Sequence, residues 1–248
     1  MIEFKHYQPV PDLLRERVIL VTGAGQGIGR VAALTFAAHG ATVILHGREV
    51  GKLESVYDQI ESAGGPQPTI LPLDLATARD RDFDNMALAI ESQLQRLDGI
   101  LHNASHLTDP APLDNQRLEQ WLLLLRVNLA APFALTRACS HLLRAAADAS
   151  VIFTSETHAL EPAAYWGGFA VSKSVLSALV KIQAQEWAGL SNLRVNLLVP
   201  GPVDSPQRQH THPGEAARSR RRPESIMPAY LYLMGPDSRG VSGEAVYC

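Results

Sequence analysis

Short apolar runs alternate with longer segments of helical periodicity along the chain. The apolar runs have the length and composition of buried strands, and they lie at 17–22, 41–45, 69–73, 99–102, 150–154, 193–198 and 245–247. The segments between them carry helical patterns, and they lie at 28–39, 49–63, 79–97, 118–147, 171–188 and 225–234. We expect the longest of these to break near Pro132, which cannot donate a backbone hydrogen bond. The alternation predicts an α/β fold, a doubly wound parallel sheet with helices on both faces.

No internal repeat, linker or low-complexity block divides the chain. We therefore predict a single domain over residues 1–248, with an N-terminal extension at 1–16. The segment 202–223 has no strand pattern and is rich in polar residues, proline and glycine, which is typical of a mobile lid over a substrate site. The arginine-rich run at 218–222 is interpreted as a solvated helix end or loop.

The composition excludes several classes of protein. Lys and Arg total 22 against 25 acidic residues, and the net charge of -3 argues against a nucleic-acid partner. The two cysteines form no disulfide framework, and neither they nor the nine scattered histidines show metal-ligand spacing, so we expect no metal. We find no secretory signal and no apolar stretch of about 18 residues, so we expect a cytoplasmic protein without a membrane partner.

A glycine-rich turn joins the first predicted strand to the first predicted helix. Such a turn lets backbone N–H groups approach a pyrophosphate at the N-terminus of the helix. It contains Gly23, Gly25, Gln26, Gly27, Ile28 and Gly29. The sequence therefore predicts a dinucleotide site at the carboxyl end of the first strand.

The same turn reads Thr-Gly-x-x-x-Gly-Ile-Gly, which resembles the fingerprint of the short-chain dehydrogenase/reductase family. Further residues are similar to family motifs, in order along about residues 15–247: Asp74, Leu75, Asn103, Ala104, Asn128, Lys173, Pro200 and Gly201. The resemblance implies that all of these except Asn128 contact the cofactor, and that Asn128 and Lys173 belong to the catalytic set. It also implies a Rossmann fold, a nicotinamide cofactor, a carbonyl or alcohol as small-molecule substrate, and a homodimer or homotetramer.

The end of the second strand indicates which nicotinamide cofactor binds. An NAD site places an acidic residue there for the ribose 2′-hydroxyl, whereas arginine accommodates the 2′-phosphate of NADP. Here Gly47 occupies the acidic position and Arg48 follows it, which favours NADP(H). Glu49 is an acidic residue that lies two positions after Gly47, beyond Arg48, and it is the one feature here that favours NAD(H). Arg30 is either a second positive charge for the phosphate or a solvated helix residue.

Two catalytic positions of the family hold other residues. The family's tyrosine, which acts as general acid and base, stands four residues before its lysine, and Phe169 occupies that position. The position of its serine, thirteen residues before the tyrosine, holds Glu156. Because a phenyl ring has no ionisable proton, reduction chemistry would need a substitute for the tyrosine.

Three side chains are candidate substitutes. Glu156 is either a proton donor facing the nicotinamide or an ion-pair partner of Lys173. Tyr165, one helical turn before Phe169, is either a hydroxyl in the cleft or a packing residue. His158 can titrate near neutrality but has no partner identifiable from the sequence.

Two functions remain open at this point. One is an NADP(H)-dependent oxidoreductase with altered catalytic chemistry, acting on a carbonyl or alcohol. The other is a cofactor-binding protein without turnover, a sensor or the silent partner of an active subunit. The helical stretches 128–143 and 171–187 are apolar on more than one face, which is typical of helices that pack in a homo-oligomer.

Overall fold

The computed structural model describes residues 4–248, so the first three residues of the expected extension at 1–16 lie outside the described residues. Seven strands form one sheet in the order β3-β2-β1-β4-β5-β6-β7, and every neighbouring pair is parallel. The strands are β1 (Val18–Thr22), β2 (Thr42–Gly47), β3 (Thr69–Pro72), β4 (Gly99–His102), β5 (Ala149–Thr154), β6 (Leu193–Val199) and β7 (Ala245–Tyr247). The predicted parallel α/β fold is confirmed.

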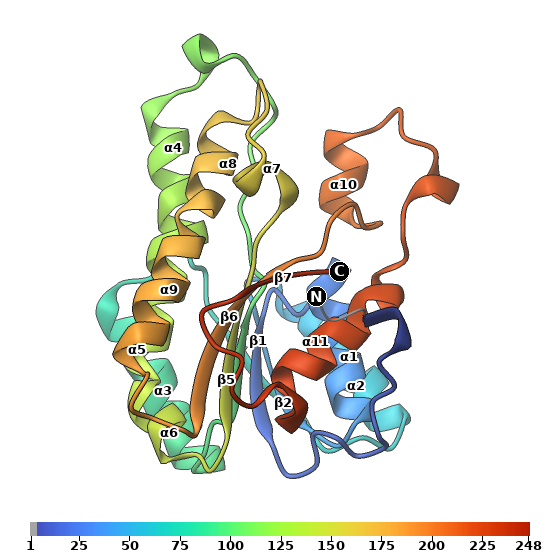
Figure 1. Cartoon of the computed structure of the whole chain (residues 1–248), viewed down its shortest axis with the longest axis vertical. Helices are drawn as coiled ribbons and strands as arrows, with labels where there is room; N and C mark the ends of the chain where they lie inside the picture. Colours follow the sequence, from blue (N-terminus) through green and yellow to red (C-terminus); the bar gives the residue numbers. More distant parts are fainter. Residues whose placement is uncertain (1–3) are drawn as a thin grey trace.

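Helices cover both faces of the sheet, as Figure 1 shows with the sheet seen nearly edge-on. One layer contains α1 (Gly27–Ala38), α2 (Val50–Ser62) and α11 (Met227–Met234). The other layer contains α3 (Asp80–Leu94), α4 (Leu118–Leu125), α5 (Ala131–Ala138), α6 (Ser140–Ala145), α8 (Gly167–Ser174) and α9 (Leu176–Glu186). Two short helices, α7 (Thr157–Leu160) and α10 (Pro206–Thr211), lie beyond the carboxyl ends of the strands.

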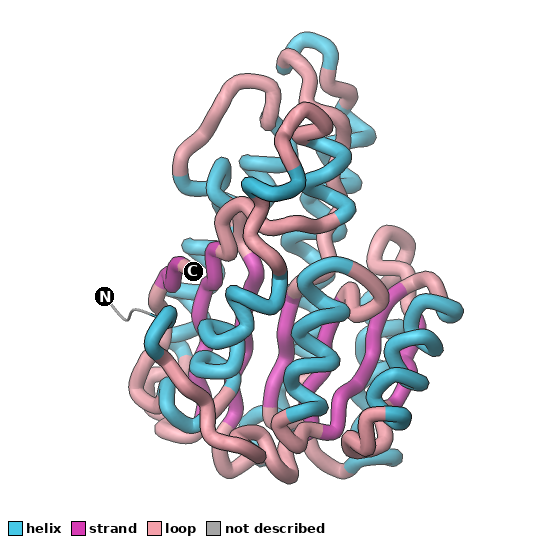
Figure 2. Tube along the Cα trace, turned by 90° about the vertical axis from the view of Figure 1, so that its right-hand side faces the viewer, coloured by secondary structure: helices cyan, strands magenta, loops and turns pink. Residues whose placement is uncertain are grey.

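Burial on both faces explains why the inner strands are continuously apolar rather than alternating. Every residue of β1, β4, β5 and β6 is buried, and each helical layer packs on its own hydrophobic cluster. The edge strands β3 and β7 are short and partly exposed. They lie at the two sides of the sheet (Figure 2). Short edge strands limit pairing with other chains.

The predicted long helix at 118–147 is broken in two places. A π-helical segment, Arg126–Ala130, separates α4 from α5, directly before Pro132. Because Pro132 has no N–H, the regular hydrogen-bond ladder cannot pass through this turn. The helix also ends at Cys139, which is buried in the core as expected for a small apolar residue.

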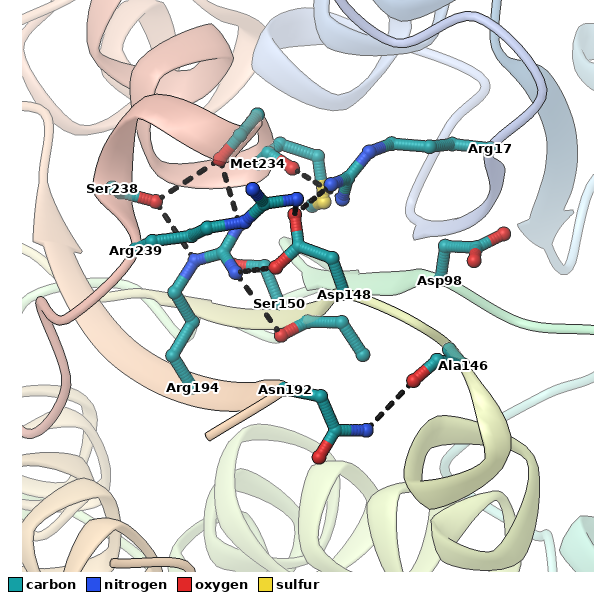
Figure 3. A network of polar contacts seen from close by, with 12 residues as sticks. Arg17, Asp98, Ala146, Asp148, Ser150, Asn192, Arg194, Met234, Ser238 and Arg239 are labelled. Carbon is teal, nitrogen blue, oxygen red and sulfur yellow. Dashed lines mark hydrogen bonds and ion pairs between the residues drawn. The ribbon is translucent and has the colours of Figure 1, made fainter. Parts of the chain in front are cut away.

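The amino ends of the strands are joined by a buried polar network, drawn in Figure 3. Asp148, directly before β5, forms ion pairs with Arg17 before β1 and with Arg194 on β6. Arg17 also donates to the Met234 carbonyl oxygen (3.0 Å), and Arg194 donates to the hydroxyl of Ser238 (2.8 Å). The network therefore connects three strands with the end of α11. It lies at the amino ends of the strands, whereas parallel α/β folds bind ligands at the carboxyl ends.

Candidate cofactor and active site

A cavity of about 520 Å³ lies over the carboxyl ends of the strands. Its lining includes the turns after β1 and β4, between which the strand order reverses, and this is where open α/β sheets bind ligands. The predicted cofactor residues that line it are Gly23, Gly25, Gln26, Gly27, Ile28, Arg48, Asp74, Leu75, Asn103, Ala104, Lys173, Pro200 and Gly201. Of the predicted catalytic residues, Glu156 and Lys173 line the cavity, whereas Asn128 and Tyr165 are not among its lining residues.

The glycine turn has the close packing that a pyrophosphate cradle needs. Gly23 has φ +68°, and a Cβ there would meet Ala104 Cα at 3.0 Å. Gly29 is buried in the first turn of α1, and a Cβ there would lie 2.6 Å from Asn103 Nδ2 and closer still to the carbonyl oxygen of Gly23. Glycine at these positions keeps the N-terminus of α1 open to an anion, so the residues present fit a dinucleotide.

Thr22 holds the two motifs of this cradle together, a role that the sequence analysis missed. Its Oγ1 accepts the backbone N–H groups of Asn103 and Ala104 (both 3.0 Å) and donates to the Leu101 carbonyl oxygen (3.2 Å). The loop after β4 is thereby fixed against the end of β1. A threonine at the start of a glycine turn was the only sequence signal for this contact.

The end of β2 carries positive charge on the wall of the cavity next to the glycine turn. Arg48 is exposed there, and Lys52 on α2 lines the same wall. The carboxylate of Glu49 is held by Lys52 Nζ (2.9 Å), which also donates to Gln26 Oε1 (3.0 Å). The negative charge of Glu49 is therefore paired with the positive charge of Lys52. Arg30, weighed above as a second phosphate contact, instead donates to the side chain of Gln59.

His46 is a second feature of this wall that the sequence analysis did not predict. Its side chain is fully buried in the lining of the cavity, and neither ring nitrogen has a hydrogen-bond partner within the described residues. Burial lowers the pKa of His46 to about 4, so the ring is neutral at pH 7.

Lys173 is a buried cation in the lining of the cavity. Its Nζ donates to the Thr154 carbonyl oxygen at the end of β5 (2.9 Å). Burial lowers the pKa of Lys173 to about 8, and the nearby charge of Glu156 partly opposes that shift. The ammonium group is thus positioned by backbone rather than by an ion pair with Glu156, the alternative weighed from the sequence.

Asn128 does not line the cavity but binds two residues near it, His106 and Ser172. It lies in the π-helical segment, where its Oδ1 accepts the backbone N–H of His106 (2.7 Å). Its Nδ2 donates to the carbonyl oxygen of His106 (3.0 Å) and to Ser172 Oγ (2.9 Å). Asn128 therefore ties the loop after β4 to α8, the helix that carries Lys173.

Glu156 pairs with His158 rather than with Lys173. Its Oε1 lies 2.8 Å from His158 Nδ1 and also accepts the backbone N–H of His158 (2.7 Å). The imidazole is stacked on the indole of Trp166, with ring centroids 4.2 Å apart and an interplanar angle of 13°. All three side chains line the cavity.

Ser155 and Tyr165 are two hydroxyl-bearing residues that precede Phe169 in the sequence. Phe169 lines the cavity with its ring buried, and Ser155 has a buried Oγ there without a hydrogen-bond partner in residues 4–248. Tyr165 was expected one helical turn before Phe169, but α8 begins only at Gly167. Tyr165 has φ +74° and is 59% exposed, so the structure does not bring its hydroxyl to Glu156 and Lys173.

The segment expected as a lid, 202–223, forms one wall of the cavity. Its residues that line it are Pro202, Val203, Ser205, Pro206, Gln207, Arg208, Thr211 and His212. His212 is stacked on Trp166, with ring centroids 5.7 Å apart. The arginine run is not simply solvated, because the Arg220 side chain is buried and pairs with Glu215 (3.3 Å) and Asp204 (3.4 Å).

No group of three or more His, Cys, Asp or Glu in residues 4–248 is placed to hold a metal ion. In the same part of the chain, no helix has both the length and the hydropathy for a membrane crossing.

The parallel sheet carries a glycine cradle where its strand order reverses, between β1 and β4, and a buried lysine on α8. These features define a dinucleotide-binding α/β protein. The family model for the short chain dehydrogenase matches residues 17–216, and the chain belongs to that family.

Known relatives are similar over almost their whole length. The uncharacterized oxidoreductase YciK of Escherichia coli (strain K12) is 42% identical over 238 residues, which are 96% of this chain and 94% of YciK. The structure of a short chain dehydrogenase from Pseudomonas syringae superposes with a TM-score of 0.95 at 43% identity, covering 100% of this chain and 99% of the other. A short chain dehydrogenase from Escherichia coli CFT073 complexed with NADPH has a TM-score of 0.93 at 40% identity, covering 96% and 99%.

Proposed function

We propose that this member of the oxidoreductase family binds NADP(H) and interconverts a small carbonyl compound and its alcohol. The observation that carries the cofactor assignment is the end of β2, where Gly47 leaves room for a 2′-phosphate. Arg48 and Lys52 supply positive charge to that wall, and Lys52 neutralises Glu49. The similar structure that was solved with NADPH supports the same assignment.

Replacing Arg48 by alanine is expected to weaken NADPH binding by about 10- to 100-fold and to leave NADH binding nearly unchanged. A guanidinium binds phosphate in a bidentate way, and a charge-assisted hydrogen bond contributes about 1.5–3 kcal/mol. Titration calorimetry with both cofactors measures the difference. The matched control is Arg30→Ala, because Arg30 faces Gln59 instead. Preference of the unmodified protein for NADH would contradict the assignment.

The part of the cavity around Lys173 and Glu156 supports reduction of a carbonyl. When bound, the nicotinamide supplies a hydride to the carbonyl carbon. Lys173 brings a buried cation into the cavity, where it would hold the nicotinamide ribose beside the reacting carbonyl, and the Thr154 carbonyl oxygen fixes its direction. Asn128 positions α8, and Glu156 brings a carboxylate into the same cavity. Phe169 adds an apolar wall that excludes water.

A second function is favoured by one specific observation. Phe169 is buried at the position where the family has its tyrosine, so the usual proton donor is absent. The alternative is a protein that binds NADP without turnover, as a sensor or as a silent subunit. Oxidation of NADPH across a panel of aldehydes and ketones distinguishes the two functions. Consumption that depends on the carbonyl supports the reductase, and tight binding without consumption supports the alternative.

We also propose that the chain assembles as a homodimer or homotetramer through the helical layer of α4, α5, α8 and α9. Large apolar side chains are exposed on this layer at Leu118, Leu122, Phe133, Val171 and Ile182. Several large apolar side chains exposed on one helical layer favour an interface there. Light scattering at micromolar concentration is expected to give at least twice the monomer mass. A monomer mass would contradict the proposed assembly.

A further inference from the structure

We propose that Glu156 and His158 form the acid–base pair of this site, with His158 as the residue that exchanges a proton with the substrate oxygen. The inference rests on the proposed carbonyl reduction and names the group that replaces the missing tyrosine. It assigns to Glu156 the role of orienting and charge-stabilising the imidazole rather than that of direct donor.

The geometry has the parts of an oriented imidazole. Glu156 Oε1 accepts from Nδ1 of His158 at 2.8 Å, which leaves Nε2 as the nitrogen available to a ligand. A carboxylate on one ring nitrogen fixes the tautomer and stabilises the imidazolium. Both side chains are largely buried, each 21% exposed, and both line the cavity that contains Lys173.

Trp166 keeps the imidazole in this orientation. Its indole is nearly parallel to the His158 ring at a centroid distance of 4.2 Å, and it also contacts Phe169 (5.9 Å) and His212 of the lid segment (5.7 Å). A stacked ring has few alternative rotamers, and a cation over an indole face is stabilised further. The His158 imidazole is thus held at Nδ1 by the Glu156 carboxylate and on its face by the Trp166 ring.

The helix-capping role of Glu156 does not account for this arrangement. Its carboxylate accepts the backbone N–H of His158 at the start of α7, which a Ser, Thr or Asp would also satisfy. The cap requires neither an imidazole at position 158 nor a tryptophan stacked on it. The same Oε1 serves the cap and the imidazole together, so a single carboxylate fixes both backbone and ring.

The proton step balances with the chemistry of the proposed function. The carbonyl carbon gains a hydride, and the π-electron pair of the C=O bond moves to oxygen. The oxygen takes the Nε2 proton of the His158 imidazolium, which forms the alcohol O–H. The neutral ring keeps the proton on Nδ1, which stays hydrogen-bonded to Glu156, and Nε2 regains a proton from solvent. Oxidation of the alcohol runs through the same positions in reverse.

The test combines His158→Ala, Glu156→Ala and the double variant in the full-length protein. His158→Ala is expected to lower kcat for NADPH oxidation by about 10²-fold or more, the range of a general acid, with the Kd for NADPH within about threefold. Added imidazole is expected to restore at least part of the rate, because it can occupy the space beside Trp166. The double variant is expected to be no slower than His158→Ala, since residues that act as a unit are non-additive.

The matched control is His141→Ala, which removes a histidine from an exposed pair with Glu91 (3.5 Å) remote from the cavity lining. Its rate should equal that of the unmodified protein. A readout without cofactor is the ¹⁵N imidazole spectrum, where the neutral His158 ring is expected to carry its proton on Nδ1. Glu156→Ala should remove that preference.

The possible results of these measurements separate the acid–base pair from the proposed reductase activity. Retained activity in His158→Ala, loss that imidazole does not rescue, or an Nε2-protonated neutral ring would overturn the acid–base pair and leave the proposed reductase standing. No carbonyl-dependent NADPH oxidation by the unmodified protein would overturn both. Loss with intact NADPH binding, rescue by imidazole and the Nδ1 tautomer together support the pair.

Discussion

Replacing Gly29 by alanine is expected to weaken NADPH binding by more than about 100-fold while the sheet stays folded. The added Cβ would lie 2.6 Å from Asn103 Nδ2 and closer still to the Gly23 carbonyl oxygen, both parts of the cradle. The Gly23 carbonyl oxygen is a backbone atom in a turn with positive φ, so it cannot yield to the added Cβ as the end of a side chain could. The N–H groups at the start of α1 would then no longer converge on a pyrophosphate.

The matched control is Gly51→Ala on α2. Gly51 lies in a helix, and a Cβ there would have nothing within 4 Å. This variant is expected to bind NADPH normally and to gain roughly 0.5–1 kcal/mol of stability, because alanine is the better helix former. Calorimetry and thermal unfolding measure both quantities. NADPH binding by Gly29→Ala at the unmodified affinity would contradict the cradle at the start of α1.

Replacing Asp148 by asparagine is expected to destabilise the protein by about 3–5 kcal/mol, the usual cost of leaving buried charges unpaired. Arg17 and Arg194 are both buried beside the carboxylate, and Arg239 lies 3.5 Å from it at the surface (Figure 3). The amide would leave these guanidinium groups close together without their counter-charge. Since total stability is typically about 5–15 kcal/mol, this loss is large.

The same network sets a pH dependence with a definite sign. Burial raises the pKa of the Asp148 carboxyl, but the charges of Arg194 and Arg17 outweigh burial and hold that pKa below its ordinary value. A group whose pKa is lower in the folded protein stabilises it above the unfolded pKa, and that contribution is lost as pH falls through the folded value. The unmodified protein should therefore lose more stability in acid than Asp148→Asn does.

Urea unfolding at neutral and acidic pH measures both effects. The matched control is Glu119→Gln, which removes a carboxylate from an exposed pair with Arg117 (3.5 Å). Exposed pairs contribute little, so the control should unfold like the unmodified protein. A stability of Asp148→Asn equal to that of the control would show that the buried network is neutral in sum.

The strand and helix pattern was readable from the sequence because it depends on local periodicity. Continuous apolar runs such as Val18–Thr22 identified strands buried on both faces, and the missing N–H of Pro132 placed a helix break within a few residues. The glycine cradle was equally local, since a turn that must approach a phosphate requires glycine at fixed spacing. The positive charge at Arg48 followed from its position one residue after a strand end.

The tertiary structure alone decided which of these side chains meet. Arg17, Asp148 and Arg194 are separated by more than forty residues each, so no local pattern indicated their network. The fold brings Thr22 to the loop after β4, eighty residues further along the chain, and turns Arg220 inward to Glu215 and Asp204.

Sequence and tertiary structure also contribute differently at the acid–base candidates, which are close together in the chain. The sequence identified Glu156, Tyr165 and His158 as titratable neighbours of Phe169, but their directions depend on one turn of backbone. Tyr165 adopts a positive φ before α8 begins, and its exposed side chain is not part of the cavity lining, while Glu156 caps α7 and so meets His158. Residue types and spacing thus determined which chemistry is present, and the path of the backbone, set by burial and hydrogen bonding across the whole sheet, decided which atoms lie within reach of one another.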